Sequence, residues 1–169
     1  MGSGAWTAVG DPHLNAAGRI SATIRPASSA DVAAVAVIER ESFGDPWSDE
    51  TFRELLRMRD AIFLVATRQS PETITGYVIA RVVAEEADVL NLAVTPSERG
   101  RGLGGELLDV GLAAVTDKGA REVFLEVRES NVAALALYGS REFVTVSRRR
   151  NYYRNPVEDA LLLRRAIEG

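Results

Sequence analysis

Hydrophobic residues recur along the chain with two periods, and their order predicts a mixed α/β protein. Alternating apolar positions or short apolar runs predict strands over 20–25, 61–67, 74–84, 87–94, 121–128, 143–146 (extending toward Tyr152) and 158–165. Apolar residues three and four apart predict helices that begin near Ser28, Ser48, Leu103 and Ser130 or Asn131. The order β-α-α-β-β-β-α-β-α-β-β predicts an α/β (α+β) fold with a mixed sheet, antiparallel first and βαβ later.

The 169 residues have the length of about one domain, and no repeat or linker separates a second one. We therefore expect a single domain over residues 20–169. Residues 1–19 are rich in small side chains and show no period. They predict an N-terminal arm without regular structure, or residues that come from an expression vector.

Charge and composition narrow the possible classes of protein. The chain has 20 Lys and Arg against 24 Asp and Glu, a formal net charge of −4, which argues against a dedicated nucleic-acid binder. It has no cysteine and one histidine, His13, so disulfides and thiolate chemistry are excluded and a metal site is not expected. No apolar run reaches the about 18 residues that span a membrane. We expect a cytoplasmic protein without membrane or nucleic-acid partners, and we favour a monomer.

A glycine-rich loop, Arg99-Gly100-Arg101-Gly102-Leu103-Gly104-Gly105, stands between a predicted strand and a predicted helix. Glycines let a ligand approach the backbone closely, and N–H groups at a helix N-terminus favour anions. Because the two arginines add positive charge, the loop is a candidate phosphate cradle. The alternative is a turn that binds nothing.

The same loop matches the dinucleotide-binding pattern G-x-G-x-x-G through Gly100, Gly102 and Gly105. Two features argue against a Rossmann domain. Five residues separate Val94, at the end of the strand, from the first glycine, and the strands before it are predicted to be antiparallel. The chain has no G-x-x-x-x-G-K-S/T motif, so a Walker-type nucleotidase is not supported.

Several segments, in order, resemble the GCN5-related N-acetyltransferases and, within them, the RimI-type ribosomal-protein N-alpha-acetyltransferases. Asn91-Leu92-Ala93-Val94 followed by Arg99-x-x-Gly102-x-Gly104 resembles the family's acetyl-CoA-binding signature, Q/R-x-x-G-x-G/A. The other segments are Phe43-Gly44-Asp45-Pro46-Trp47-Ser48, Leu125-Glu126-Val127-Arg128 with Ser130-Asn131, Ala134 and Leu137-Tyr138, then Arg149-x-Asn151-Tyr152-Tyr153 and Glu158-Asp159-Ala160. The resemblance covers roughly residues 20–167 and implies the family's acyl-CoA N-acyltransferase fold.

The resemblance also implies a reaction, in which an acetyl group moves from acetyl-CoA to the N-terminal amine of a protein. The implied substrate is the eighteenth protein of the small ribosomal subunit, which begins with Ala. Glu126 is implied as the base and Tyr138 as the acid for the leaving thiolate. Contacts with acetyl-CoA are expected from Leu92, Ala93, Val94, Arg99, Gly100, Arg101, Gly102, Leu103, Gly104, Gly105 and Asn131. Substrate contacts are expected from Trp47, Glu86, Tyr152 and Tyr153.

Without the resemblance, Glu126 reads as a surface carboxylate and Tyr138 as a core aromatic. Two departures from the family pattern stand out: Gly44-Asp45 between Phe43 and Pro46, and Glu142 where a glycine is usual. The sequence also has two clusters of charged residues, which can bind a partner or simply face solvent. One is the acidic cluster Glu85, Glu86 and Asp88, and the other is the basic cluster Arg148, Arg149, Arg150 and Arg154.

Two other functions remain open at this point. The acetylated amine can belong to a lysine side chain or a small molecule, or the chain can be a non-catalytic module that binds acetyl-CoA and a partner. Transfer to peptides with free or blocked N-termini distinguishes the first of these from N-terminal acetylation. Absence of any turnover indicates the second.

Overall fold

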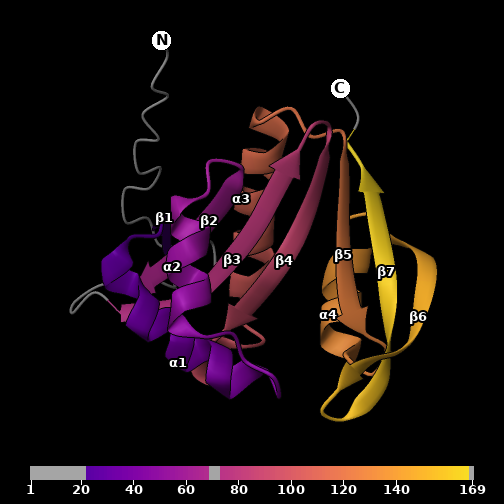
Figure 1. The fold of residues 1–169 in the computed structure, drawn as a ribbon, viewed down its shortest axis with the longest axis horizontal. Coiled ribbons are helices and arrows are strands. Elements are labelled where there is room, and N and C mark those ends of the chain that lie inside the picture. Colours follow the sequence, from indigo (N-terminus) through magenta and orange to yellow (C-terminus); the bar gives the residue numbers. More distant parts are fainter. Residues whose placement is uncertain (1–21, 69–72, 168–169) are drawn as a thin grey trace.

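The computed structural model describes residues 22–68 and 73–167. Its elements are β1 (Thr23–Pro26), η1 (Ser29–Asp31), α1 (Val32–Ser42), α2 (Asp49–Arg57), β2 (Ala61–Arg68), β3 (Thr73–Val83), β4 (Glu86–Val94), η2 (Pro96–Glu98), α3 (Leu103–Asp117), β5 (Glu122–Arg128), α4 (Val132–Gly139), β6 (Val144–Arg154) and β7 (Val157–Ala166) (Figure 1). Apart from the two 3-10 turns η1 and η2, this order confirms the predicted one. The arm predicted for residues 1–19 lies outside the described residues.

The seven strands form one sheet in the order β1-β2-β3-β4-β5-β7-β6. All neighbours are antiparallel except β4 and β5, which are parallel and are connected by α3. Helices α1 and α2 cover one face of the sheet, and α3 and α4 cover the other (Figure 1). The predicted mixed sheet is therefore confirmed. No helix in the described ranges is both long and apolar enough to cross a membrane.

Side chains along β3 point alternately to the two faces of the sheet, and each face has its own hydrophobic core. Tyr77 and Ile79 point to the cluster under α1 and α2, where they meet Phe52. Val78 points to the other cluster, where it packs with Leu107 of α3. Each such side chain contributes about 1.5–3 kcal/mol when fully buried. These two cores hold the ends of β4, α1 and α3 in fixed relative positions, and those ends build the candidate site.

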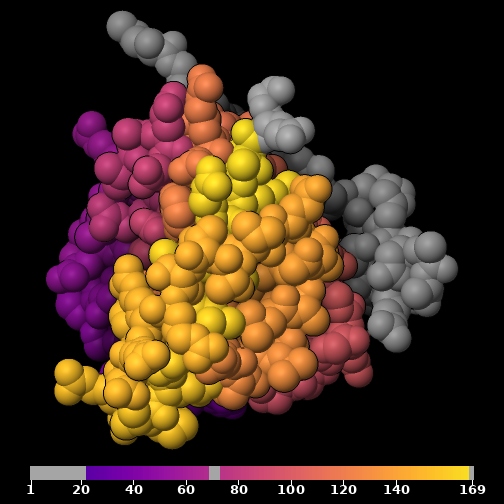
Figure 2. Space-filling view, turned by 90° about the vertical axis from the view of Figure 1, so that its right-hand side faces the viewer, coloured from indigo at the N-terminus to yellow at the C-terminus, as the bar shows by residue number. Residues whose placement is uncertain are grey.

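The C-terminal elements differ from the prediction in their boundaries. Helix α4 ends at Gly139 rather than near Arg141, and the next residue but two, Glu142, has a φ of 64°. That left-handed backbone explains why the family usually has glycine there. Strand β6 runs on to Arg154, although nearly all of it is exposed. It belongs to the orange and yellow surface that faces the viewer in Figure 2. Its length is set by pairing with β7. Because its side chains are exposed, the sequence of β6 has no alternation of apolar and polar residues that would predict this length.

Candidate active site

Strands β4 and β5 pair only over their first four residues, from Glu86 opposite Glu122 to Val89 opposite Leu125. Beyond that point β4 pairs only with β3, and β5 only with β7, so the two strands diverge (Figure 1). A register shift against β3 leaves Leu90 as an extra residue at the point of divergence. Such a bulge bends a strand and increases its twist. The second half of β4 thus presents an unpaired backbone edge to the opening between the strands.

The three predicted cofactor residues at the end of β4 line this unpaired half. Ala93 is buried against the α1–α2 core, whereas Val94 is buried on the opposite face and the half-buried Leu92 packs beside it. The side chains are thus used in packing. The free backbone edge remains available for a ligand that lies between the strands.

The glycine loop follows β4 after the short turn η2 and ends in the first turn of α3. Gly100 and Gly102 have φ values of 71° and 89°, a conformation that only glycine adopts without strain. Gly102 is the N-cap residue, and Leu103, which begins the helix, is buried. Among the described residues, no acceptor is hydrogen-bonded to the backbone N–H groups of 100–105. The helix dipole and these free donors keep the loop a candidate anion site.

The two arginines of the loop have different surroundings. Arg99 is braced internally, since its Nε donates to the Val94 carbonyl at 3.0 Å and its Nη2 to Ser42 Oγ of α1 at 3.1 Å. Arg101 is half exposed and lies 3.7 Å from the buried Glu98, which is also paired with Arg68 of β2. Arg99 therefore connects the loop with α1, while Arg101 is ion-paired within the segment that precedes α3, and both side chains are exposed.

Glu126 lies on β5 just beyond the last pair with β4, on the sheet face opposite to Leu125 and Val127. Its carboxylate is partly exposed and accepts from Arg149 of β6, with Nη1 and Oε1 2.7 Å apart. The guanidinium of Arg149 also lies 5.5 Å from the ring of Tyr152. A hydrogen bond to the Glu126 carboxylate raises the pKa of Tyr152, so the two groups are neighbours. The structure thus places a carboxylate beside the opening with a cation already bound to it.

Tyr138 of α4 is buried, with its ring 5.8 Å from that of Phe143. Burial, followed by the interaction with Tyr153, raises its pKa to about 12. Tyr153 is linked to Glu126 in turn, since burial and the Glu126 charge raise its pKa to about 12 as well. Arg128 covers the Tyr153 ring at 4.1 Å. Tyr153 thus interacts with Glu126 and with Tyr138, and both phenols stay protonated at neutral pH.

The loop between α1 and α2 approaches the turn between β6 and β7. A Cβ added to Gly44 would lie 2.6 Å from the backbone oxygen of Asn155, so the two segments are in direct backbone contact. In the same loop, the half-buried Trp47 packs on Phe52 with ring centroids 5.9 Å apart. The unusual Gly44-Asp45 pair is therefore the place where the loop meets the β6–β7 turn.

Some predicted residues do not join this group. Glu86 lies at the start of β4, where β4 and β5 are still paired, and the neighbouring Glu85 is bound to Arg121 at 3.0 Å. Asn131 caps α4 by accepting from the Ala134 N–H at 3.1 Å, so its side chain has a local structural role. Arg148 is held by Glu129 and Asp159. Sequence reasoning left Arg149 within a basic patch, and only its pairing with Glu126 reveals its place.

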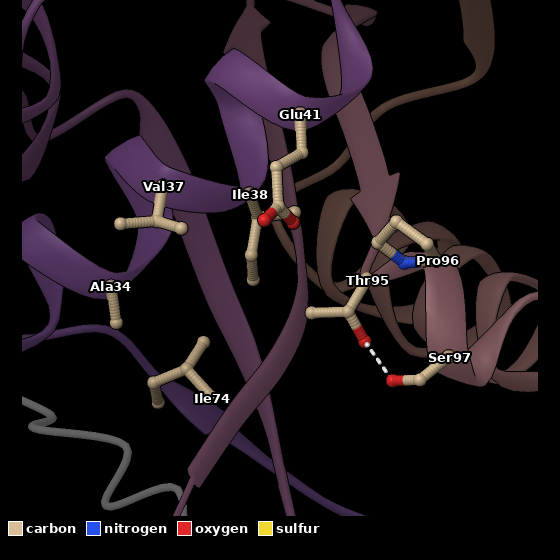
Figure 3. A pocket seen from close by; sticks show the side chains of 8 residues that line it. All are labelled: Ala34, Val37, Ile38, Glu41, Ile74, Thr95, Pro96 and Ser97. Carbon is tan, nitrogen blue, oxygen red and sulfur yellow. Dashed lines mark hydrogen bonds between the residues drawn. The ribbon is translucent and has the colours of Figure 1, made fainter.

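A shallow hollow on the surface lies apart from these residues (Figure 3). It runs between the outer side of α1, Ile74 and the start of η2, and none of the predicted site residues lines it. Thr95 and Ser97 contact each other at its rim, with their hydroxyl oxygens 3.4 Å apart. Within residues 22–68 and 73–167, no group of three or more His, Cys, Asp or Glu could hold a metal ion. The opening beside β4 is thus the better candidate site.

Known proteins resemble the chain over most of its length. The sequence model of the acetyltransferase (GNAT) family matches residues 32–143. The [ribosomal protein bS18]-alanine N-acetyltransferase of Salmonella typhimurium is 35% identical over 143 residues, which cover 83% of this chain and 95% of the relative. The N-alpha-acetyltransferase RimI of Mycobacterium tuberculosis is 36% identical over 153 residues, covering 85% and 91%.

A solved structure agrees with these relatives. The crystal structure of the ribosomal-protein-S18-alanine N-acetyltransferase from Escherichia coli matches with a TM-score of 0.79 and 32% identity, covering 88% of this chain and 97% of that one. The family resemblance predicted from the glycine loop and the flanking segments is therefore confirmed. By its matched family model, its relatives and its fold, this chain belongs to the acetyltransferase (GNAT) family.

Proposed function

We propose that this protein transfers the acetyl group of acetyl-CoA to the N-terminal amine of a protein, with the N-terminal Ala of ribosomal protein bS18 as substrate. The observation that carries the proposal is the group at the divergence of β4 and β5. There Glu126 stands on β5 just beyond its last pair with β4, and the unpaired part of β4 leads toward the glycine loop, whose backbone N–H groups are free. The family resemblance adds Tyr138, a buried and protonated phenol. Substrates named for the relatives support the choice of bS18. A ribosomal substrate places the reaction in the cytoplasm.

The residues present fit acetyl-CoA. Its phosphates suit the free N–H groups of the glycine loop and the accessible Arg101, as anions do at helix N-termini. The extended pantetheine arm of acetyl-CoA suits the gap beside Leu92, Ala93 and Val94, where β4 is no longer paired with β5. An unpaired backbone N–H of this edge is suited to polarise the thioester carbonyl, as in an oxyanion hole.

The acceptor amine must be neutral to attack, and an α-amino group with a pKa of about 7.7–8.0 is largely protonated at neutral pH. We assign Glu126 as the base that accepts that proton, directly or through water. The cation of the substrate takes over the position that Arg149 occupies in its absence. The amine nitrogen then bonds to the carbonyl carbon, the carbon–sulfur bond breaks, and the thiolate leaves.

We assign Tyr138 the role of donor to the leaving thiolate, because a phenol O–H can donate a hydrogen bond to it. Its pKa of about 12 exceeds that of an ordinary thiol, about 8.5, so complete proton transfer from it to the sulfur is uphill. Tyr138 therefore acts mainly as a hydrogen-bond donor while the negative charge develops. Complete transfer of the phenol proton to the sulfur requires that the resulting tyrosinate takes up another proton, from solvent or from the amine.

The experiment measures acetyl transfer to a free Ala-initiated bS18 peptide and to the same peptide with a blocked N-terminus and a free lysine. Transfer to the free N-terminus alone is expected. Glu126→Gln should lower kcat by about 10²–10⁴-fold, the usual worth of a positioned base. Glu122→Gln is the matched control, since it lies on the same face of β5 where the strands still pair, and it should keep kcat.

Tyr138→Phe should lower kcat without moving the alkaline limb of the pH profile, because its phenol stays protonated below pH 11. Transfer to the lysine peptide instead would replace the N-terminal substrate by a side-chain amine. Binding of acetyl-CoA with no transfer to any amine would indicate a non-catalytic module.

A further inference from the structure

Glu39 of α1 is a buried acid that the proposed reaction does not use. Its side chain is 1% exposed, and its surroundings are the apolar core under α1 and α2, including Ile38 and Phe52. Among the described residues, no Lys or Arg forms an ion pair with it. A buried carboxylate without a counter-charge is a poor choice for stability alone, because an apolar side chain of similar volume avoids its desolvation.

Three donors from three different segments converge on this carboxylate. The backbone N–H of Trp47, in the α1–α2 loop, donates to Oε1 at 3.0 Å. The Asn91 amide of β4 donates to Oε2 at 2.9 Å, and the Tyr77 hydroxyl of β3 donates to the same oxygen. The two oxygens of the carboxyl group accept all three bonds, whereas the amide of a glutamine has a single accepting oxygen and would lose at least one of them.

These partners lie on two segments that border the opening between β4 and β5. Asn91 stands next to the bulge at Leu90, on the part of β4 that has lost β5 as a partner. Trp47 belongs to the loop whose other part, Gly44, touches Asn155 of the β6–β7 turn. Glu39 thus ties the loop that borders the opening to the strand that borders it.

We infer that Glu39 is a positioning residue for the acceptor peptide. It sets the separation between the α1–α2 loop and β4 without touching the reacting atoms. This inference rests on the proposed function. It deepens it by giving the buried acid of α1, which is outside the expected site residues, a part in binding the acceptor.

The test compares wild type with Glu39→Gln in two ways. In steady-state assays, the variant should raise KM for the Ala-initiated peptide about tenfold and change KM for acetyl-CoA by less than twofold. By hydrogen exchange, the Trp47 amide should exchange at least tenfold faster. Leu112→Ala, in the core on the other face of the sheet, is the control for a general loss of stability, and it should change neither reading.

A double-mutant cycle tests whether Tyr77 acts on peptide binding through the carboxyl group of Glu39. Tyr77→Phe removes only the hydroxyl donor, so it should raise the peptide KM less than Glu39→Gln does. Because both act through one carboxylate, the double variant should be no worse than Glu39→Gln alone.

The outcomes separate this inference from the proposed function. The inference is overturned if Glu39→Gln raises both KM values alike, leaves the Trp47 amide unchanged, or is matched by Leu112→Ala. A wild-type protein that acetylates no peptide overturns the proposed function itself.

Discussion

The contact between Gly44 and Asn155 predicts a large effect from the smallest possible substitution. In Gly44→Ala the new Cβ would start 2.6 Å from the Asn155 oxygen, whereas ordinary contacts begin near 3.4 Å. The loop and the β6–β7 turn must therefore separate by about 0.8 Å. The φ of Gly44 lies outside the left-handed region, so this separation is the only strain that the methyl group introduces.

A displacement of about 1 Å at a positioned substrate can lower the rate about 10²-fold. We therefore expect Gly44→Ala to reduce kcat/KM for the Ala-initiated peptide by about 10- to 100-fold. Because both segments are exposed, the free energy of unfolding should change by less than about 1 kcal/mol. The assay is initial-rate kinetics with varied peptide at saturating acetyl-CoA, together with urea denaturation.

Gly139→Ala is the matched control. It lies at the end of α4, where an added Cβ meets nothing within 4 Å, and it should keep the wild-type kcat/KM. Wild-type kinetics in Gly44→Ala would refute the reasoning, since the spacing of the two segments would then not control binding of the acceptor. An equal loss of activity in both variants would refute it too.

Two further predictions concern stability. Hydrogen bonds from Arg25, with those from Ser28, lower the pKa of the buried Asp31 from 3.8 to about 2. The ionised carboxylate therefore adds about 2 kcal/mol to the free energy of unfolding. This stabilisation is full above pH 4 and is lost as the pH falls through 2. Asp31→Asn should therefore destabilise the protein in urea at pH 7 and hardly at pH 2; an equal loss at both would contradict this. Glu142→Gly should raise the free energy of unfolding by up to about 1 kcal/mol, because it relieves a left-handed φ of 64°. The ion pair between Glu142 and Arg165, 3.7 Å long, contributes little to stability because Glu142 is exposed. A lower melting temperature for Glu142→Gly than for wild type would contradict this prediction.

Local patterns predicted the elements because each of them depends on its own residues. The alternation of Val123, Leu125 and Val127 predicted β5, and the capping box of Ser28 and Asp31 is present, although it begins the 3-10 turn η1 rather than α1 itself. Strand β6 had no such pattern. Its arginines face solvent or other charged residues, and only the pairing with β7 sets its length.

The candidate site was predicted in part for the same reason. The glycine loop is a continuous segment whose positive φ values and position before a helix follow from its own residues, so the sequence sufficed. The family resemblance added Glu126 and Tyr138. The contact of Arg149 with Glu126 was not predictable, because it joins two strands that are not neighbours in the sheet.

The sequence by itself determined the order of the elements, the position of the glycine loop and the family. The tertiary structure decided where β4 and β5 separate, which cation occupies the carboxylate of Glu126, and how Glu39 collects donors 8, 38 and 52 residues away. The physical reason is the range of the interactions. Periodicity, capping and backbone freedom act within a few residues, whereas ion pairs and buried hydrogen bonds require the sheet register that the whole chain sets.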